Sequence, residues 1–111
     1  MSTATLVSVE EYLATSWRPD RELVEGVLVE RNVGQKDHSN LQTELAVWFR
    51  NRRLQLSLTA LVEMRIRVSA TRFRIPDVCV VDLPIPDEQV FIRPPLICAE
   101  VISPDDSLRG M

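Results

Sequence analysis

Residues 74–81 read RIPDVCVV. This stretch predicts a strand over Arg74–Val81 that Pro76 and Asp77 interrupt. The residues after Asp77 are apolar at every position, which is typical of a strand buried on both faces in the interior of a sheet. An unpaired carboxylate in such a place would be costly or would stay protonated. We therefore expect Asp77 to bind a cation or to meet a specific partner.

A second predicted strand, Leu96–Ile102, repeats this pattern around Glu100, its one charged residue. If the two strands are neighbours, Asp77 and Glu100 can lie within a few ångström, close enough to hold one divalent cation between them. The alternative is an ordinary α/β domain in which these acids lie at strand ends or pair with an arginine such as Arg74. Two acids embedded in the same way favour the metal site.

The first part of the chain predicts a helix and a hairpin. Ser8, with two glutamates in the turn that follows, is a typical N-cap, and apolar residues recur at helical spacing as far as Trp17. Pro19 ends this helix. Residues alternate over Glu22–Arg31 around Glu25-Gly26, a two-residue turn signal, and so predict a β-hairpin.

The middle of the chain predicts a long helix and a strand. Asp37 or Ser39 can cap the helix, whose apolar residues repeat at helical spacing to about Leu54. From Thr59 to Val68 the residues alternate between apolar and polar, which predicts one half-buried strand with a polar face. A turn over Ser69–Thr71 then leads into the strand described first.

Composition limits the class of protein. With 111 residues, the chain has room for one domain, residues 1–111. A hydrophobic content of 45% and a charged content of 26% are typical of globular proteins and argue against disorder. No apolar run approaches the ~20 residues of a membrane span, and the N-terminus lacks the order of a secretory signal, so the cytoplasm is the expected location.

The two cysteines, Cys79 and Cys98, each lie inside an apolar run. Both are predicted to be buried free thiols, because no cluster of cysteine and histidine with zinc-binding spacing is present in the sequence. A disulfide between them stays open as an alternative.

The net charge of −3 argues against polyanion binding by overall charge alone. Basic residues are nevertheless grouped: Arg50, Arg52 and Arg53 form one group, and Arg65, Arg67, Arg72 and Arg74 form another. A solvated helix end and a charged strand face explain these groups, and a local nucleic-acid footprint is the alternative. Arg65 and Arg67 are the accessory candidates for phosphate contacts.

Two further residues are candidates for a site. Glu22 opens the predicted hairpin and is the best third acid, with an exposed hairpin-end charge as the alternative. His38 is the only histidine and lies at the start of the long helix, where a capping or surface role competes with that of a base or ligand.

Four motifs together resemble the Uma2 family of restriction-endonuclease-like proteins. Residues 21–30, RELVEGVLVE, resemble its opening hairpin, and His38 with Leu41 and Leu45 resembles its histidine-led helix. Residues 74–81 are similar to its Pro-Asp strand, and residues 100–107, EVISPDDS, are similar to its last strand end. The resemblance implies the PD-(D/E)xK nuclease fold, an α/β domain with a mixed sheet flanked by helices, preceded here by the N-terminal helix and hairpin.

The resemblance also implies roles for residues. Asp77 and Glu100 would be the catalytic acids and the ligands of Mg²⁺ or Mn²⁺, and the backbone carbonyl of Val101 would complete the set. Glu22 would be the accessory catalytic acid. A water on the metal would become the nucleophile that hydrolyses DNA phosphodiester bonds, and the metal would stabilise charge on the phosphate.

Two features depart from the family pattern. Ile102 stands where the motif has a lysine. In the family the basic role moves to a helix that follows the Ser-Pro-Asp turn, and the start of such a helix is predicted here at Ser103. The chain reaches Met111 before that helix and the final strand, so we expect an incomplete domain. A second copy would cover the uncovered apolar surface, which makes a homodimer the expected assembly. The alternative function is then a non-catalytic binding or dimerisation module that keeps the fold.

Overall fold

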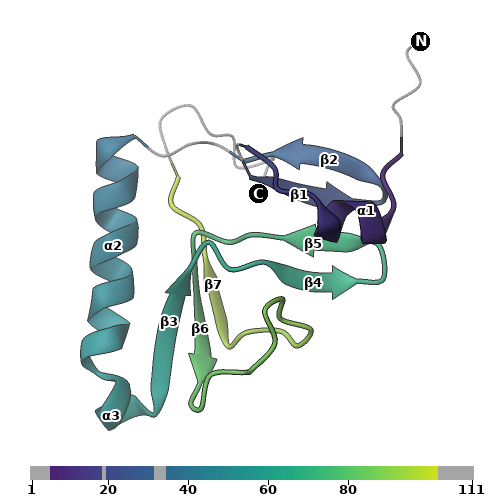
Figure 1. Cartoon of the computed structure of the whole chain (residues 1–111). Helices are drawn as coiled ribbons and strands as arrows, with labels where there is room; N and C mark the ends of the chain where they lie inside the picture. The colour runs from purple at the N-terminus through teal and green to yellow at the C-terminus, as the bar shows by residue number, and fades with distance from the viewer. Residues whose placement is uncertain (1–5, 19, 32–34, 103–111) are drawn as a thin grey trace.

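The structure, a computed structural model, describes residues 6–18, 20–31 and 35–102. Within these ranges the chain forms two antiparallel sheets with helices beside them (Figure 1). The elements in chain order are α1 (Val9–Ala14), β1 (Arg21–Val24), β2 (Val27–Glu30), α2 (Lys36–Asn51), α3 (Arg53–Leu56), β3 (Leu58–Val62), β4 (Ile66–Ser69), β5 (Arg72–Arg74), β6 (Val78–Asp82) and β7 (Ile97–Ala99). None of the helices described is long and apolar enough to cross a membrane.

The larger sheet has the order β2-β1-β5-β4 and packs against α1. The predicted hairpin is present, and its turn residues Glu25 and Gly26 have positive φ angles of 50° and 82°, as a two-residue hairpin turn requires. The predicted cap is present as well, since the Ser8 hydroxyl accepts a hydrogen bond from the backbone N–H of Glu11 at 3.1 Å. Tyr12 of α1 is buried against the strands and fixes the helix on the sheet.

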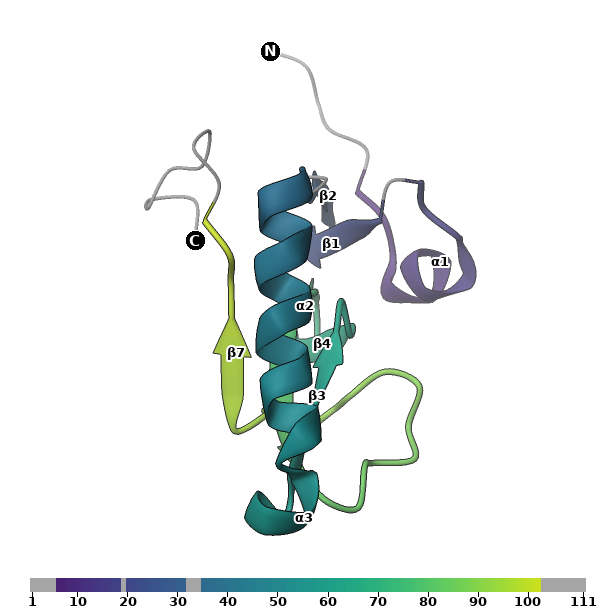
Figure 2. The same cartoon turned by 90° about the vertical axis from the view of Figure 1, so that its left-hand side faces the viewer.

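The smaller sheet has the order β3-β6-β7, so β6 is central and the other two strands are edges. One face of β6, formed by Val78 and Val80, packs against α2, which runs alongside this sheet (Figure 2). On the opposite face, Cys79 and Val81 belong to a cluster that includes Ile66 of β4, so the two sheets share a core. Burial on both faces matches the apolar sequence of β6.

At the junction of the two sheets, the strand predicted over Thr59–Val68 is divided in two, which corrects the sequence prediction, and the strand predicted over Arg74–Val81 is interrupted at Pro76 and Asp77 as predicted. The strand predicted over Thr59–Val68 breaks at Glu63, whose φ of 49° turns the chain from β3 in the smaller sheet toward β4 in the larger one. Pro76 and Asp77 likewise separate β5 from β6. The two crossings lie side by side, since the backbone N–H of Glu63 donates to the carbonyl of Asp77 at 3.2 Å.

The long helix also has different ends from those predicted. It is preceded by Gln35, which makes no side-chain capping bond, so Asp37 and Ser39 lie inside the first turns instead of capping it. Arg52 interrupts the predicted run to Leu54, and α3 follows as a separate short helix.

The last strand is shorter than the predicted Leu96–Ile102. Because β7 is an edge, Cys98 is exposed, which contradicts its predicted burial, whereas Cys79 is fully buried as predicted. Both thiols are free. The helix start predicted at Ser103 lies outside the described residues.

Candidate functional site

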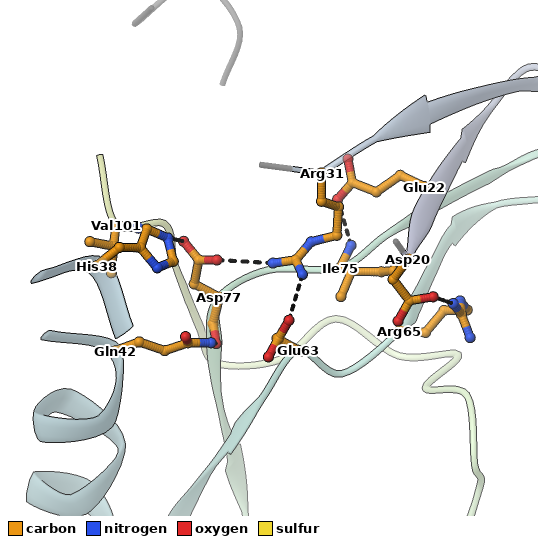
Figure 3. A network of polar contacts seen from close by, with 10 residues as sticks. All are labelled: Asp20, Glu22, Arg31, His38, Gln42, Glu63, Arg65, Ile75, Asp77 and Val101. Carbon is orange, nitrogen blue, oxygen red and sulfur yellow. Dashed lines mark hydrogen bonds and ion pairs between the residues drawn. The ribbon is translucent and has the colours of Figure 1, made fainter. Parts of the chain in front are cut away.

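Asp77 is the centre of a buried polar network at the junction of the two sheets (Figure 3). Its side chain is only 6% exposed, and both carboxylate oxygens have partners. Arg31 Nη2 donates to Oδ1 at 2.9 Å, and the backbone N–H of Val101 donates to Oδ2 at 2.7 Å. His38 Nε2 lies 3.2 Å from the same Oδ2. The arginine that pairs with Asp77 is therefore Arg31, and not the Arg74 considered from the sequence.

The first turns of α2 hold the other side of this network. Gln42 Nε2 donates to the backbone carbonyl of Asp77 at 2.8 Å, which fixes the main chain where β6 begins. His38 lies one turn earlier, with a side chain 10% exposed, so it is neither a capping nor a surface residue. Its second ring nitrogen, Nδ1, is buried without a hydrogen-bond partner among the described residues.

Arg31 links the two chain crossings. Its Nη1 donates to Glu63 at 2.8 Å while its Nη2 donates to Asp77, and its side chain is 13% exposed. Sequence reasoning missed Arg31, Gln42 and Glu63. Arg31 is 32 residues from Glu63 and 46 residues from Asp77 in sequence, so no local pattern connects them.

Glu100 follows the end of β7, the strand that neighbours β6. The register pairs Val78 of β6 with Ala99 of β7, and the two acids follow immediately outside that pair. Desolvation, then the charge of Asp77 and a hydrogen bond with it, raise the pKa of Glu100 to about 7. Glu100 is exposed, so water screens part of this repulsion. The structure thus brings together the two acids that the sequence singled out.

Glu22 is held near this pair and is not an exposed hairpin charge. Its side chain is 12% exposed, and its two oxygens accept from Arg74 Nε at 3.1 Å and from the backbone N–H of Ile75 at 2.6 Å. Its negative charge is a further cause of the raised pKa of Glu100. Asp77 and Glu22 therefore both act on the pKa of Glu100, the third predicted acid.

The remaining predicted residues have other contacts. Val101 contacts Asp77 through its backbone N–H, whereas the sequence suggested a role for its carbonyl. Arg65 donates to the Tyr12 hydroxyl and forms an ion pair with Asp20 at 2.7 Å. Arg67 donates to the backbone carbonyls of Ser69 and Ala70. Both arginines stabilise the larger sheet, and neither of these contacts involves an acid of the Asp77 network.

A divalent cation at this site would need ligands from the side chains around Asp77. Among residues 6–18, 20–31 and 35–102, no group of three or more histidine, cysteine, aspartate or glutamate side chains is spaced to hold a metal. The adjacent carboxylates of Asp77 and Glu100 nevertheless supply the oxygen ligands that Mg²⁺ and Mn²⁺ prefer, and Mg²⁺ commonly takes one or two carboxylates and completes its shell with water. Desolvation is the largest cause of the raised pKa of Glu100, and the charge of Asp77 comes next, which is a repulsion that a cation between the two acids would relieve. The pair fits such an ion.

Comparison with known proteins agrees with this architecture. Residues 9–110 match the family described as "Uma2: Putative restriction endonuclease", and the chain belongs to that family. No curated protein matches the chain. A similar solved structure is described as "Crystal structure of a putative nuclease belonging to DUF820 from Anabaena variabilis ATCC 29413". It is 23% identical with a TM-score of 0.79.

The match covers 94% of this chain and 63% of that structure, so the chain spans less than two thirds of its structural neighbour. The predicted family and the predicted restriction-endonuclease-like fold are both confirmed. The predicted mixed sheet is corrected, because the strands described form two sheets in which every named pair is antiparallel.

Proposed function

We propose that this domain hydrolyses DNA phosphodiester bonds with Mg²⁺ or Mn²⁺ bound by Asp77 and Glu100. The observation that carries the proposal is the placement of these acids immediately outside the paired residues Val78 of β6 and Ala99 of β7, where Asp77 helps to raise the pKa of Glu100 to about 7. Perturbed acids of this kind are concentrated at functional sites. Membership of a family described as putative restriction endonucleases supports the reaction class.

The chain's own residues would prepare the site. The N–H of Val101 and the ring of His38 orient the Asp77 carboxylate, and Gln42 fixes the backbone beneath it. Glu22, held by Arg74, adds negative charge that attracts a cation. When bound, the divalent ion would lower the pKa of a water molecule and stabilise charge on the phosphate.

Calorimetric titration with Mn²⁺ tests the metal site. We expect wild-type protein to bind Mn²⁺, and we expect Asp77→Asn and Glu100→Gln to lose that binding, because each removes one of two ligands. Glu44→Gln is the matched control, since it removes an exposed acid of α2 outside the site and should leave binding unchanged. Absence of binding heat in wild-type protein at millimolar Mn²⁺ would refute the metal site.

Cleavage is tested separately with supercoiled plasmid and with single-stranded DNA. We expect nicking that requires Mg²⁺ or Mn²⁺, stops with chelator and is absent in Asp77→Asn. Metal binding without any cleavage would keep the site and reject hydrolysis by this chain.

The exposed apolar surface favours a second candidate, a non-catalytic module that forms a homodimer. Leu41, Val47 and Trp48 of α2 are 55%, 44% and 47% exposed, and Ile97 of the edge strand β7 is 46% exposed. Exposed apolar side chains near unpaired strand edges are typical of association surfaces. This candidate predicts a dimer by light scattering together with no cleavage under any divalent ion, whereas a monomer would exclude it.

A further inference from the structure

Arg31 already places a positive charge at the centre of the candidate site. Its guanidinium reaches Asp77 Oδ1 at 2.9 Å and Glu63 Oε1 at 2.8 Å, and its side chain is 13% exposed (Figure 3). One guanidinium therefore joins Asp77, to which the metal is assigned, to Glu63, which is outside the assigned ligands.

The contact of Arg31 with Asp77 is the one that a cation would replace. Oδ2 of Asp77 is engaged by the Val101 N–H and by His38, and among the described residues Oδ1 accepts from the Arg31 guanidinium. A divalent ion shared by Asp77 and Glu100 would lie beside the guanidinium with charge of the same sign. Like charges at such separations repel strongly where water is scarce.

Glu63 is a second carboxylate partner that can hold the Arg31 guanidinium when its contact with Asp77 is broken. The side chain of Glu63 is 54% exposed, whereas that of Asp77 is 6% exposed, so the Arg31–Glu63 pair can persist nearer solvent after the Asp77 contact breaks. A bridging arginine with one buried and one exposed partner can therefore leave the first without losing the second.

We propose that Arg31 and a divalent cation compete for Asp77, so that Arg31 is an internal cation that sets the metal affinity of the site. This inference rests on the proposed function, because it assumes that Asp77 and Glu100 bind the metal. The chemical class of the competing ligand is a small divalent ion that prefers oxygen, such as Mn²⁺.

Calorimetric titration with Mn²⁺ of wild-type, Arg31→Gln and Arg31→Lys protein measures the competition. Removing the guanidinium is expected to tighten Mn²⁺ binding about tenfold, within the usual range of coupling between two ligands. Arg31→Lys keeps the positive charge but lacks the guanidinium that contacts two carboxylates at once, and it should give a smaller gain in Mn²⁺ affinity. Arg21→Gln is the matched control, because it removes a positive charge that pairs with Glu30 and should leave the affinity unchanged.

Each outcome separates this inference from the proposed function. Wild-type and Arg31→Gln protein that bind Mn²⁺ equally, or a variant that binds more weakly, would overturn the competition and leave the metal site standing. Failure of both to bind would overturn the metal site and the competition with it.

A crystal of wild-type protein soaked with Mn²⁺ tests the inference without any substitution, so the result does not depend on whether a variant folds. We expect anomalous density beside Asp77 and a guanidinium that has left Oδ1 while it remains with Glu63. Density beside Asp77 with the Arg31–Asp77 ion pair intact would overturn the competition.

Discussion

The neighbouring strands β6 and β7 have similar apolar sequences and very different surroundings. In β6, Val78 and Val80 are 0% and 1% exposed, whereas Ile97 of β7 is 46% exposed. Their facing cysteines differ in the same way, because Cys79 is buried and Cys98 is exposed. The position in the sheet accounts for this, since β6 is covered by α2 on one face and by the second sheet on the other, and β7 is an edge.

The acids at the ends of these strands repeat the contrast. As a whole residue Asp77 is 4% exposed and is surrounded by donors, whereas Glu100 is exposed, and desolvation followed by the charge of Asp77 raises its pKa to about 7. The same residue class in the same sequence pattern is thus a structural anchor on one strand and an uncompensated charge on the other. Buried carboxylates are retained where donors compensate their desolvation, and exposed ones are compensated by water.

The largest expected difference is between Asp77→Ala and Glu100→Ala. Removing Asp77 leaves the Arg31 guanidinium without one of its two carboxylate partners, which should lower the free energy of unfolding by about 3 kcal/mol. Glu100→Ala should change the free energy of unfolding by less than about 0.5 kcal/mol, as is usual for exposed positions. Urea denaturation in the presence of chelator measures both. Equal losses in the two variants would contradict the contrast between the two acids.

A smaller difference is expected for apolar side chains of the same two strands. Val80→Ala should lower the free energy of unfolding by about 2 kcal/mol, because it removes fully buried methyl groups and leaves a cavity. Ile97→Ala should cost less than about 1 kcal/mol, although it removes a larger side chain from an exposed position. Midpoints of urea denaturation compare the two, and a greater loss in Ile97→Ala would show that β7 is covered in solution.

The smallest expected effect is a pH dependence of stability from Glu100. Its pKa rises from 4.5 to about 7 on folding, so the folded state holds this proton more tightly than the unfolded state. Glu100 therefore favours folding at low pH, and that contribution is lost as the pH rises from about 4.5 through about 7. The effect is small because Glu100 is exposed and water screens its repulsion.

Chelator-treated wild-type and Glu100→Gln protein, unfolded by urea at several pH values, measure this contribution. We expect wild-type protein to lose more stability than the variant across this range. Parallel curves for the two proteins would show that folding does not raise the pKa of Glu100 in solution.

Local sequence determined those features whose physical causes lie within a few residues. The Ser8 cap and the Glu25-Gly26 turn were predictable because a hydroxyl and a positive φ act locally. Asp77 and Glu100 could be chosen as candidates because a carboxylate in an apolar run is conspicuous in any sequence. The family resemblance then implied that both acids are ligands of one metal ion.

Only the tertiary structure decided which strands are covered and which partner each acid meets. The alternation over Thr59–Val68 continues through Glu63, so its pattern does not reveal the change of sheet. Arg31 meets Asp77 across 46 residues, and no periodicity reports such a contact. Periodicity records which faces are apolar, whereas burial and ion pairing depend on what the rest of the chain places against those faces. The carboxylate pair was therefore visible in the sequence, and the arginine between Asp77 and Glu63 was not.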